Sequence, residues 1–225
     1  MTAVAYLTSL RFAPQNQFEG EVGLRGLFRA VAQEECGADD VQVFAVHRIP
    51  GDVGAYQIYE QYTGEGDRRH GTSQAVSKAF DRVLARLIMP YERVLLEPIG
   101  VWGLDKPADG DVTSDICWRF TIRVSPSDVD KIEDIQTEIM HAMEIDEFGT
   151  GDVKTYGTLK VTGDAGRYVM YEHFTAAGSA SHARGPSLPP VGEKQQQLLV
   201  TAFERLRLEP MFALGVEHAE FGTAR

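Results

Sequence analysis

The chain has 225 residues, 43% of them hydrophobic and 24% charged, a composition that excludes a collagen, a disulfide scaffold and a chain disordered throughout. This length is large for one compact domain and suits two. The net charge of −11 arises from acidic residues in both halves, and without a basic stripe the chain is a poor partner for nucleic acid or an anionic membrane.

The cysteines and the N-terminus narrow the class further. Cys36 and Cys117 are too few for a disulfide framework or a metal cluster, so we expect buried free thiols and no metal site. The first residues lack the basic segment of a signal peptide. Polar residues interrupt every apolar run well before the roughly 18 residues of a membrane helix. We therefore expect a cytoplasmic protein with no membrane partner.

The two halves of the sequence repeat each other at a constant offset of 112 residues. The clearest matches pair Gly51-Asp52-x-Gly54-x-Tyr56 with Gly163-Asp164-x-Gly166-x-Tyr168, and Glu92-Arg93-x-x-Leu96-Glu97-Pro98 with Glu204-Arg205-x-x-Leu208-Glu209-Pro210. Ungapped self-similarity of this extent indicates a duplication. We expect a first unit over 1–104, a linker over 105–112 rich in turn-forming residues, and a second unit over 113–225.

Each repeat begins with a predicted strand and an amphipathic helix. Alternating residues predict strands near 3–12 and 115–124. Apolar residues at helical spacing predict the helices, with inner faces made of Phe18, Val22, Leu27 and Val31 in the first repeat and of Ile132, Ile135, Ile139 and Ala142 in the second. Gly37 and Gly149 follow these helices, and glycine suits the left-handed conformation that commonly ends a helix.

A hairpin, a second helical region and a last strand complete each repeat. Turns rich in glycine separate strands predicted at 41–49 and 55–63, and at 153–161 and 167–175. The helix that follows in the first repeat has an inner face of Val76, Phe80, Val83, Leu84 and Leu87. Because 183–190 contains three prolines, we expect a loop there at a cavity mouth, and two cavities that are not equivalent. The last strands pass through Leu95 and Leu208.

The order β-α-β-β-α-β is the ferredoxin-like arrangement. The helices of one such unit cover only one face of its sheet. The other face is apolar and would be exposed to solvent, which a folded protein avoids. Two fused units bury these faces at high effective concentration. We therefore predict an α+β fold in which two tandem ferredoxin-like units form a pseudo-symmetric α/β barrel; a homodimer of the fused chain is compatible with this fold but not required by it.

A second set of residues recurs with fixed spacing in both repeats. A glutamate is followed two residues later by an aromatic residue and ten residues later by a histidine: Glu60, Tyr62 and His70, then Glu172, Phe174 and His182. Side chains alternate across a strand, so Tyr56, Glu60 and Tyr62 share one face and Tyr59 lies on the other. The histidine ends a short helical turn and can fold back toward the strand.

A strand ending in Glu-x-aromatic, followed by a short helix ending in His, resembles the antibiotic biosynthesis monooxygenase family of the dimeric α/β-barrel superfamily. The resemblance covers both repeats. It implies a substrate cavity between the sheet and the helices of each unit. It also implies an oxygenase that uses molecular oxygen on an anthrone, a quinol or another aromatic polyketide-like substrate, without a metal or a bound cofactor.

Such chemistry needs an apolar pocket, a base, and groups that stabilise the substrate anion. His70 and His182 have the intrinsic pKa of a base, and the candidate substrate-binding residues are Tyr62, Phe174, Glu60, Glu172 and Trp118. The tyrosines Tyr59 and Tyr171 are further candidate donors. Each residue also has a structural interpretation: the histidines can brace a turn, and the glutamates can pair with Arg11 and Arg123.

Three alternatives stay open at this point. A fused two-unit oxygenase can cleave a ring of an angucycline-type substrate with reduced flavin, which would be a diffusible co-substrate because no G-x-G-x-x-G motif is present. A non-catalytic tandem barrel can bind a small hydrophobic ligand. The third alternative is haem binding, for which the resemblance implies a ligand histidine on the second helix, where the two repeats have Phe80 and Gly192. A serine hydrolase is disfavoured because no G-x-S-x-G motif is present.

Overall fold

The computed structural model describes residues 3–34, 41–102, 112, 114–182 and 184–215. The elements of the first repeat are β1 (Val4–Arg11), η1 (Pro14–Asn16), α1 (Gln17–Glu34), β2 (Val41–Arg48), β3 (Ala55–Tyr62), α2 (Gly64–Thr72), α3 (Gln74–Leu84) and β4 (Glu92–Trp102). Those of the second are β5 (Ile116–Arg123), η3 (Pro126–Asp128), α4 (Val129–Asp146), β6 (Val153–Val161), β7 (Arg167–Phe174), α5 (Ala176–Ser181), α6 (Leu188–Leu198) and β8 (Glu204–Gly215). The predicted β-α-β-β-α-β order is confirmed in both repeats.

The strands are hydrogen-bonded in the order β1-β3-β2-β8-β5-β7-β6-β4, a closed barrel, which confirms the predicted α+β fold. The chain divides into two compact units, which we call unit 1 (1–95, 104–113 and 208–225) and unit 2 (96–103 and 114–207). The end of β4 pairs with β6 in unit 2, and the end of β8 pairs with β2 in unit 1. Each repeat therefore contributes its last strand to the sheet of the other unit. Most of the predicted linker lies outside the described residues.

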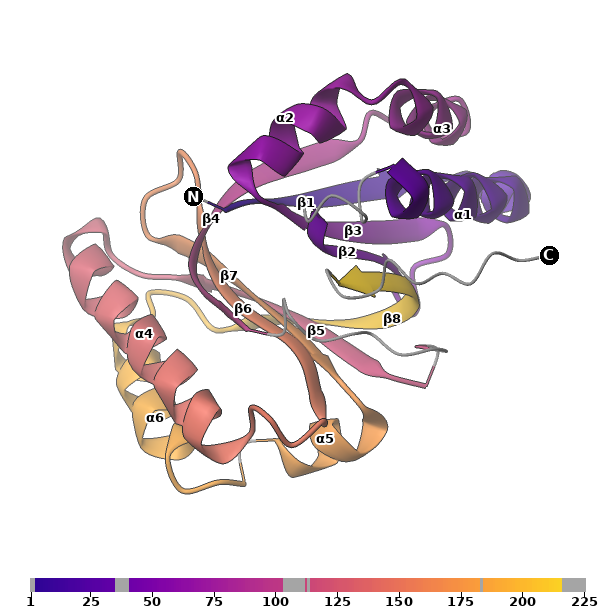
Figure 1. Ribbon diagram of the computed structural model, residues 1–225. Helices are drawn as coiled ribbons and strands as arrows, with labels where there is room; N and C mark the ends of the chain where they lie inside the picture. Colours follow the sequence, from indigo (N-terminus) through magenta and orange to yellow (C-terminus); the bar gives the residue numbers. More distant parts are fainter. Residues whose placement is uncertain (1–2, 35–40, 103–111, 113, 183, 216–225) are drawn as a thin grey trace. The chain divides into compact units, whose positions relative to one another are not determined.

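Helices cover one face of the sheet in each unit (Figure 1). In unit 1, α1 packs against α3, and in unit 2, α4 packs against α6. In unit 1, Leu24, Leu27 and Val31 of α1 pack against strand residues in one hydrophobic cluster. Sequence reasoning was wrong about Phe18 and Val22, which are 76% and 55% exposed. At 3.6 residues per turn, the step of five residues from Val22 to Leu27 places the two pairs on nearly opposite faces.

The helix α6 corrects a second prediction. A loop was expected over 183–190, but α6 begins at Leu188, with Pro189 and Pro190 in its first turn. Amide hydrogens in the first turn have no partner within the helix, so proline is tolerated there. Residues before the helix are held by Asp146, whose carboxylate accepts hydrogen bonds from the Ser187 amide at 2.8 Å and hydroxyl at 3.0 Å.

The repeated glycines and arginines serve the hairpin of each unit. Gly54 and Gly166 have φ near +82° and +84°, and a Cβ on either would lie within 2.5 Å of a backbone oxygen. Arg11 Nη1 donates to Asp52 at 2.7 Å, and Arg123 Nη2 donates to Asp164 at 2.8 Å. The expectation that Arg11 and Arg123 pair with Glu60 and Glu172 is therefore wrong.

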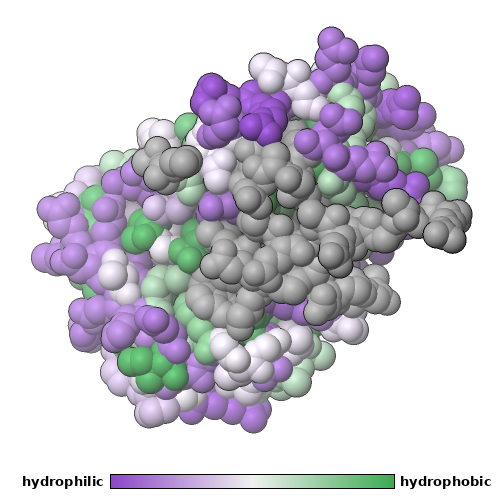
Figure 2. Space-filling model, viewed as in Figure 1, coloured by the Kyte–Doolittle hydropathy of each residue, from purple (hydrophilic) through white to green (hydrophobic). Residues whose placement is uncertain are grey.

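Gly149 follows α4 with φ of +87°, as expected, whereas Gly37 lies outside the described residues. Cys117 is a buried free thiol, as expected, and Cys36 is not among the described residues. Hydrophilic side chains predominate over the helices on the face drawn in Figure 2, with apolar ones scattered among them. None of the helices in the described part of the chain has the length and apolar character needed to cross a membrane.

Candidate functional site

The repeated glutamates sit at the centre of each sheet, on the face that the helices cover. Glu172 in β7 lies between Trp118 of β5 and Tyr156 of β6, and Glu60 in β3 lies between Tyr6 of β1 and Phe44 of β2. All of these pairs differ by 112 in residue number. The duplication has therefore preserved the place of the carboxylate and, in part, the aromatic character of its neighbours.

The short helix after each glutamate strand brings the histidine back to it. The hydroxyls of Thr63 and Thr175 accept hydrogen bonds from the amides of Gly66 and Gly178, each at 2.9 Å. These bonds cap the N-termini of α2 and α5. The ring centroids of Tyr62 and His70 are then 4.6 Å apart, and those of Phe174 and His182 are 4.7 Å apart. The structure thus brings together the predicted glutamate, aromatic residue and histidine in each unit.

Tyr59 and Tyr171, which were further candidate donors, point to the opposite face of their strands. The hydroxyl of Tyr59 donates to Gln61 Oε1 at 3.0 Å, and that of Tyr171 to Cys117 Sγ at 3.9 Å. Both tyrosines are fully buried, and neither lines a cavity beside the glutamates. They are core residues in both units.

In unit 1 the carboxylate is neutralised by a direct ion pair. Glu60 Oε2 accepts a hydrogen bond from Arg93 Nη2 at 2.7 Å and from the Tyr62 hydroxyl at 3.4 Å. The guanidinium of Arg93 also stacks on the Tyr6 ring, 3.7 Å from its centroid. His70 Nε2 lies 3.5 Å from the same Tyr62 hydroxyl. The cavity beside these groups has a volume of only about 200 Å³.

In unit 2 the equivalent carboxylate keeps an unpartnered oxygen. Glu172 is buried, and its Oε2 has no hydrogen-bond partner among the described residues. Arg205 is stacked on the Trp118 ring, 3.6 Å from its centroid, so Trp118 supports the arginine and does not itself line the cavity. His182 Nδ1 is 2.9 Å from Glu147, and its Nε2 is 4.0 Å from Glu172 Oε1. These groups line or adjoin a cavity of about 650 Å³.

The two cavities are equivalent places in the two repeats. Ten residues lining the small one correspond, at the offset of 112, to residues lining the large one: Thr8, Leu27, Phe44, Glu60, His70, Val76, Ser77, Phe80, Tyr91 and Arg93 correspond to Phe120, Ile139, Tyr156, Glu172, His182, Leu188, Pro189, Gly192, Phe203 and Arg205. The largest loss of side chain is from Phe80, which packs edge-on against Tyr91 at 5.3 Å, to Gly192. The expected difference between the cavities is present, and Gly192 explains much of it.

Burial and charge set the protonation of the unit 2 groups. Burial raises the pKa of Glu172 to about 7, although the charges of His182 and Arg205 act to lower it. Burial lowers the pKa of His182, but the hydrogen bond to Glu147 and the charge of Glu172 outweigh it, so the pKa lies above its usual value. At neutral pH, Glu172 is therefore close to its midpoint and able to accept a proton, and the protonated form of His182 is more stable than that of an ordinary histidine.

Sequence reasoning missed three contributors to these sites. Arg93 and Arg205 are the cations beside the glutamates, and their signal was present in the repeated Glu-Arg pair at 92–93 and 204–205. Glu147 orients His182, and its equivalent, Glu35, is also a glutamate but lies outside the described residues. All three are identical in the two repeats, which made them candidates, but only the fold shows what each one contacts.

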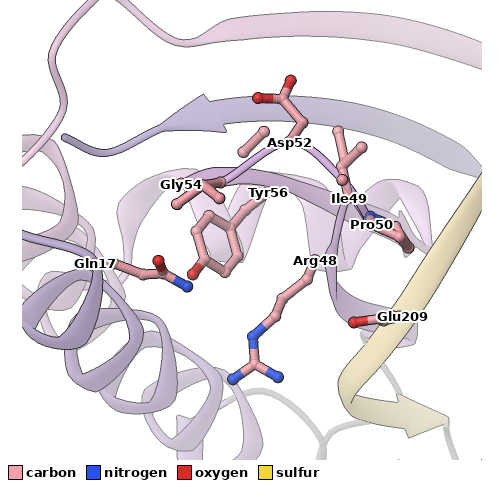
Figure 3. A pocket seen from close by; sticks show the side chains of 11 residues that line it. Gln17, Arg48, Ile49, Pro50, Asp52, Gly54, Tyr56 and Glu209 are labelled. Carbon is pink, nitrogen blue, oxygen red and sulfur yellow. The ribbon is translucent and has the colours of Figure 1, made fainter. Parts of the chain in front are cut away.

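Another hollow of unit 1 lies at the hairpin turn (Figure 3), and Glu60 is not among its lining residues. Its lining includes Arg48, Tyr56 and Gln17. Glu21 already binds the first two, accepting from Arg48 Nε at 2.8 Å and from the Tyr56 hydroxyl at 2.5 Å. Unit 2 repeats this network with Glu133, Lys160 and Tyr168. Its presence in both units indicates a structural tie between the first helix and the hairpin. In the described part of the chain, no three His, Cys, Asp or Glu side chains are grouped to hold a metal ion.

Comparison with known proteins gives the fold. No family model matches the sequence, and no curated protein matches it. Among solved structures, the chain is similar to candidate monooxygenases of Lactobacillus acidophilus (TM-score 0.80, 10% identity, 96% of this chain and 97% of that one) and of Fusobacterium nucleatum (TM-score 0.80, 10% identity, 95% and 94%). It is also similar to an anthrone oxidase-like protein (TM-score 0.57, 10% identity, 96% and 94%). The chain therefore has the two-unit α/β-barrel fold of these proteins over nearly its whole length.

Proposed function

We propose that this protein is an oxygenase of the antibiotic biosynthesis monooxygenase type, which oxidises an aromatic polyketide-like substrate, an anthrone or a quinol, with molecular oxygen in the unit 2 cavity. The descriptions of the similar structures as candidate monooxygenases and as an anthrone oxidase-like protein support this class of reaction. The observation that carries the proposal is Glu172, a buried carboxylate at the cavity wall with one oxygen unpartnered in the described structure.

In this proposal Glu172 is the base. Its Oε2 is available to take a proton from the substrate, and its pKa of about 7 matches that task at neutral pH. Arg205 and the protonated form of His182, which Glu147 and Glu172 favour, line the same cavity, so they can stabilise the resulting anion. The proposal assigns the base to Glu172 and not to His70 or His182, because Glu147 favours the protonated form of His182.

The electrons and atoms balance without a metal or a bound cofactor. Loss of a C–H proton to Glu172 converts an anthrone into an anion, which can give one electron to oxygen and recombine with it as a peroxide. The proton returns from Glu172 to the peroxide. Loss of water, with the remaining hydrogen on that carbon, leaves a new carbonyl group. One oxygen atom enters the quinone and the other leaves as water.

The test is oxygen uptake by the full chain with 1,8-dihydroxyanthrone and 1,4-naphthohydroquinone, with and without reduced flavin. The variant Glu172→Gln keeps the shape of the side chain but removes the base, and Glu60→Gln is the matched control in unit 1. We expect uptake without flavin, a loss of about a hundredfold or more in Glu172→Gln, and no change in Glu60→Gln.

Other outcomes separate the alternatives. Uptake only in the presence of reduced flavin would replace this proposal with the ring-cleaving, flavin-assisted reaction. A small aromatic ligand that binds without any uptake of oxygen would favour the non-catalytic barrel. Equal losses in Glu172→Gln and Glu60→Gln would contradict the assignment of the reaction to unit 2.

A further inference from the structure

Two buried glutamines on the helices of unit 2 occupy positions that are apolar on the helices of unit 1. In unit 1, Leu24 of α1 and Val83 of α3 are fully buried in a single hydrophobic cluster. The residues at the equivalent positions are Gln136 of α4 and Gln195 of α6, which are 0% and 3% exposed. In unit 2 the buried apolar residues of α4 belong to two clusters, with Ile139 in one and Ile132 in the other. Polar amides thus occupy positions that are apolar core in the other unit.

The large cavity lies between the two clusters of unit 2. Ile139, Tyr156 and Leu188 line it from one cluster, and Phe120, Met170 and Phe203 line it from the other. Gln195 lines it too. Residues of both clusters and one of the two glutamines therefore line the same cavity.

The hydrogen-bonding capacity of these amides is largely unused. Neither Nε2 nor Oε1 of Gln136 has a hydrogen-bond partner in the described part of the chain. Gln195 Nε2 is directed to the sulfur of Met170 at 3.6 Å, and a thioether is a weak acceptor. A buried amide without partners destabilises the fold. Gln136 lies one helical turn before Ile139 of α4, which lines the cavity. A ligand group in the cavity is therefore the partner that best explains this amide.

We propose that Gln136 and Gln195 form a second polar subsite, which binds a hydroxyl group on the substrate at the end away from Glu172. A hydroxyl both donates and accepts, so it satisfies an amide oxygen and an amide nitrogen together. Met170 and Glu172 are two residues apart on one face of β7, a distance of about 7 Å, and Gln195 lies against Met170. Fused aromatic rings span this distance. The subsite rests on the proposed function only for the role of Glu172.

The experiment measures binding, without turnover. Calorimetry of the full chain under anaerobic conditions compares 2-naphthol with 2,6-dihydroxynaphthalene, which adds one hydroxyl at the far end. We expect the wild type to bind the diol about tenfold more tightly, the effect of one hydrogen-bonded group. The variants Gln136→Leu and Gln195→Val, which install the residues of unit 1, should each reduce this preference toward unity. Thermal unfolding checks that both variants are folded.

Glu172→Gln should keep the preference for the diol, so the subsite is tested independently of the reaction. A wild type that does not distinguish the two naphthols, or that binds neither, overturns the proposal. So does a folded Gln136→Leu protein that has a raised melting temperature and an unchanged preference, because the amide would then be only a cost to stability. A preference for the diol in a protein that takes up no oxygen supports the subsite and removes the oxygenase proposal alone.

Discussion

Unit 1 and unit 2 carry the same glutamate, histidine and arginine at equivalent positions, but the two sets are in different electrostatic states. In unit 1, Arg93 binds Glu60 directly at 2.7 Å. In unit 2, Arg205 is stacked on Trp118, and Glu172 keeps an oxygen without a partner in the described structure. Tyr6 is the equivalent of Trp118, and both support the arginine. A shared motif therefore does not define an active site unless the cavity and the charge pairing are suitable too.

The two units also differ in cavity volume, because one large side chain of unit 1 is absent from unit 2. Phe80 and Tyr91 fill the small cavity of unit 1 with two packed rings, whereas unit 2 has Gly192 in place of the phenylalanine. The buried apolar residues of α1 and α3 share one cluster. Unit 1 thus has a small cavity beside a paired carboxylate. Unit 2 has a large cavity beside a carboxylate with one oxygen unpartnered among the described residues, although both units come from one duplicated sequence.

The largest expected effect concerns stability and pH. Burial raises the pKa of Glu172 from 4.5 to about 7, so folding favours its protonated form. The stability that the protonated Glu172 contributes is fully present below its pKa in the unfolded chain, 4.5. It is lost as the pH rises through its pKa in the folded protein, about 7. Between pH 4.5 and pH 8 the wild type should lose about 3 kcal/mol of unfolding free energy relative to Glu172→Gln. Urea denaturation of both proteins at pH 4.5 and pH 8 measures this. Parallel changes in the two proteins would contradict the raised pKa.

The next expected effect comes from filling the cavity of unit 2 with the residue of unit 1. No atom lies within 4 Å of the position of a Cβ at Gly192, so the backbone accepts a side chain there. Gly192→Phe should lower turnover about a hundredfold by occupying the substrate space, while the protein stays folded. Gly192→Ala is the control and should retain activity. Full turnover in a folded Gly192→Phe protein would mean that the substrate binds elsewhere.

Much of this fold was predictable because its signals are local. Strand alternation located six strands to within a residue or two, as for β3 at Ala55–Tyr62 and β7 at Arg167–Phe174. The grouping of Glu172, Phe174 and His182 also followed from strand periodicity and one short helix. Proline was misjudged at α6 because its effect depends on the position within the helix: Pro189 and Pro190 fall in the one turn that tolerates them.

The state of the site was not predictable, because it depends on contacts between distant segments. Arg205 reaches the glutamate from the last strand, and Glu147 reaches His182 from the end of α4. Neither pair could be predicted from the separation of its residues along the sequence. The nearest arginines in the predicted strands, Arg11 and Arg123, proved to bind the hairpin aspartates instead. Repeat identity identified the candidates, and the tertiary structure decided among them.

A smaller effect is expected where Glu147 controls His182. In Glu147→Gln the side chain can still accept a hydrogen bond, but its charge is gone, so the pKa of His182 should fall. We expect turnover at neutral pH to fall about tenfold as the imidazolium is lost, and the histidine signal in an NMR titration to shift to lower pH. Glu144→Gln is the control, because Glu144 pairs with His141 on the exposed surface of α4. Equal effects of the two variants would contradict a specific role for Glu147.

The smallest expected effect comes from a feature that the units share. Arg11 binds Asp52 and Arg123 binds Asp164 in the same hairpin geometry, with all four side chains 36% to 43% exposed. Exposed ion pairs contribute little, so Asp52→Asn and Asp164→Asn should each lower the unfolding free energy only slightly. Chemical denaturation should give the same small value in both units, and neither variant should change oxygen uptake. A loss of uptake in Asp164→Asn alone would mean that the difference between the units extends to the hairpin and is not confined to the cavity, which would place part of the substrate site outside the residues that surround Glu172.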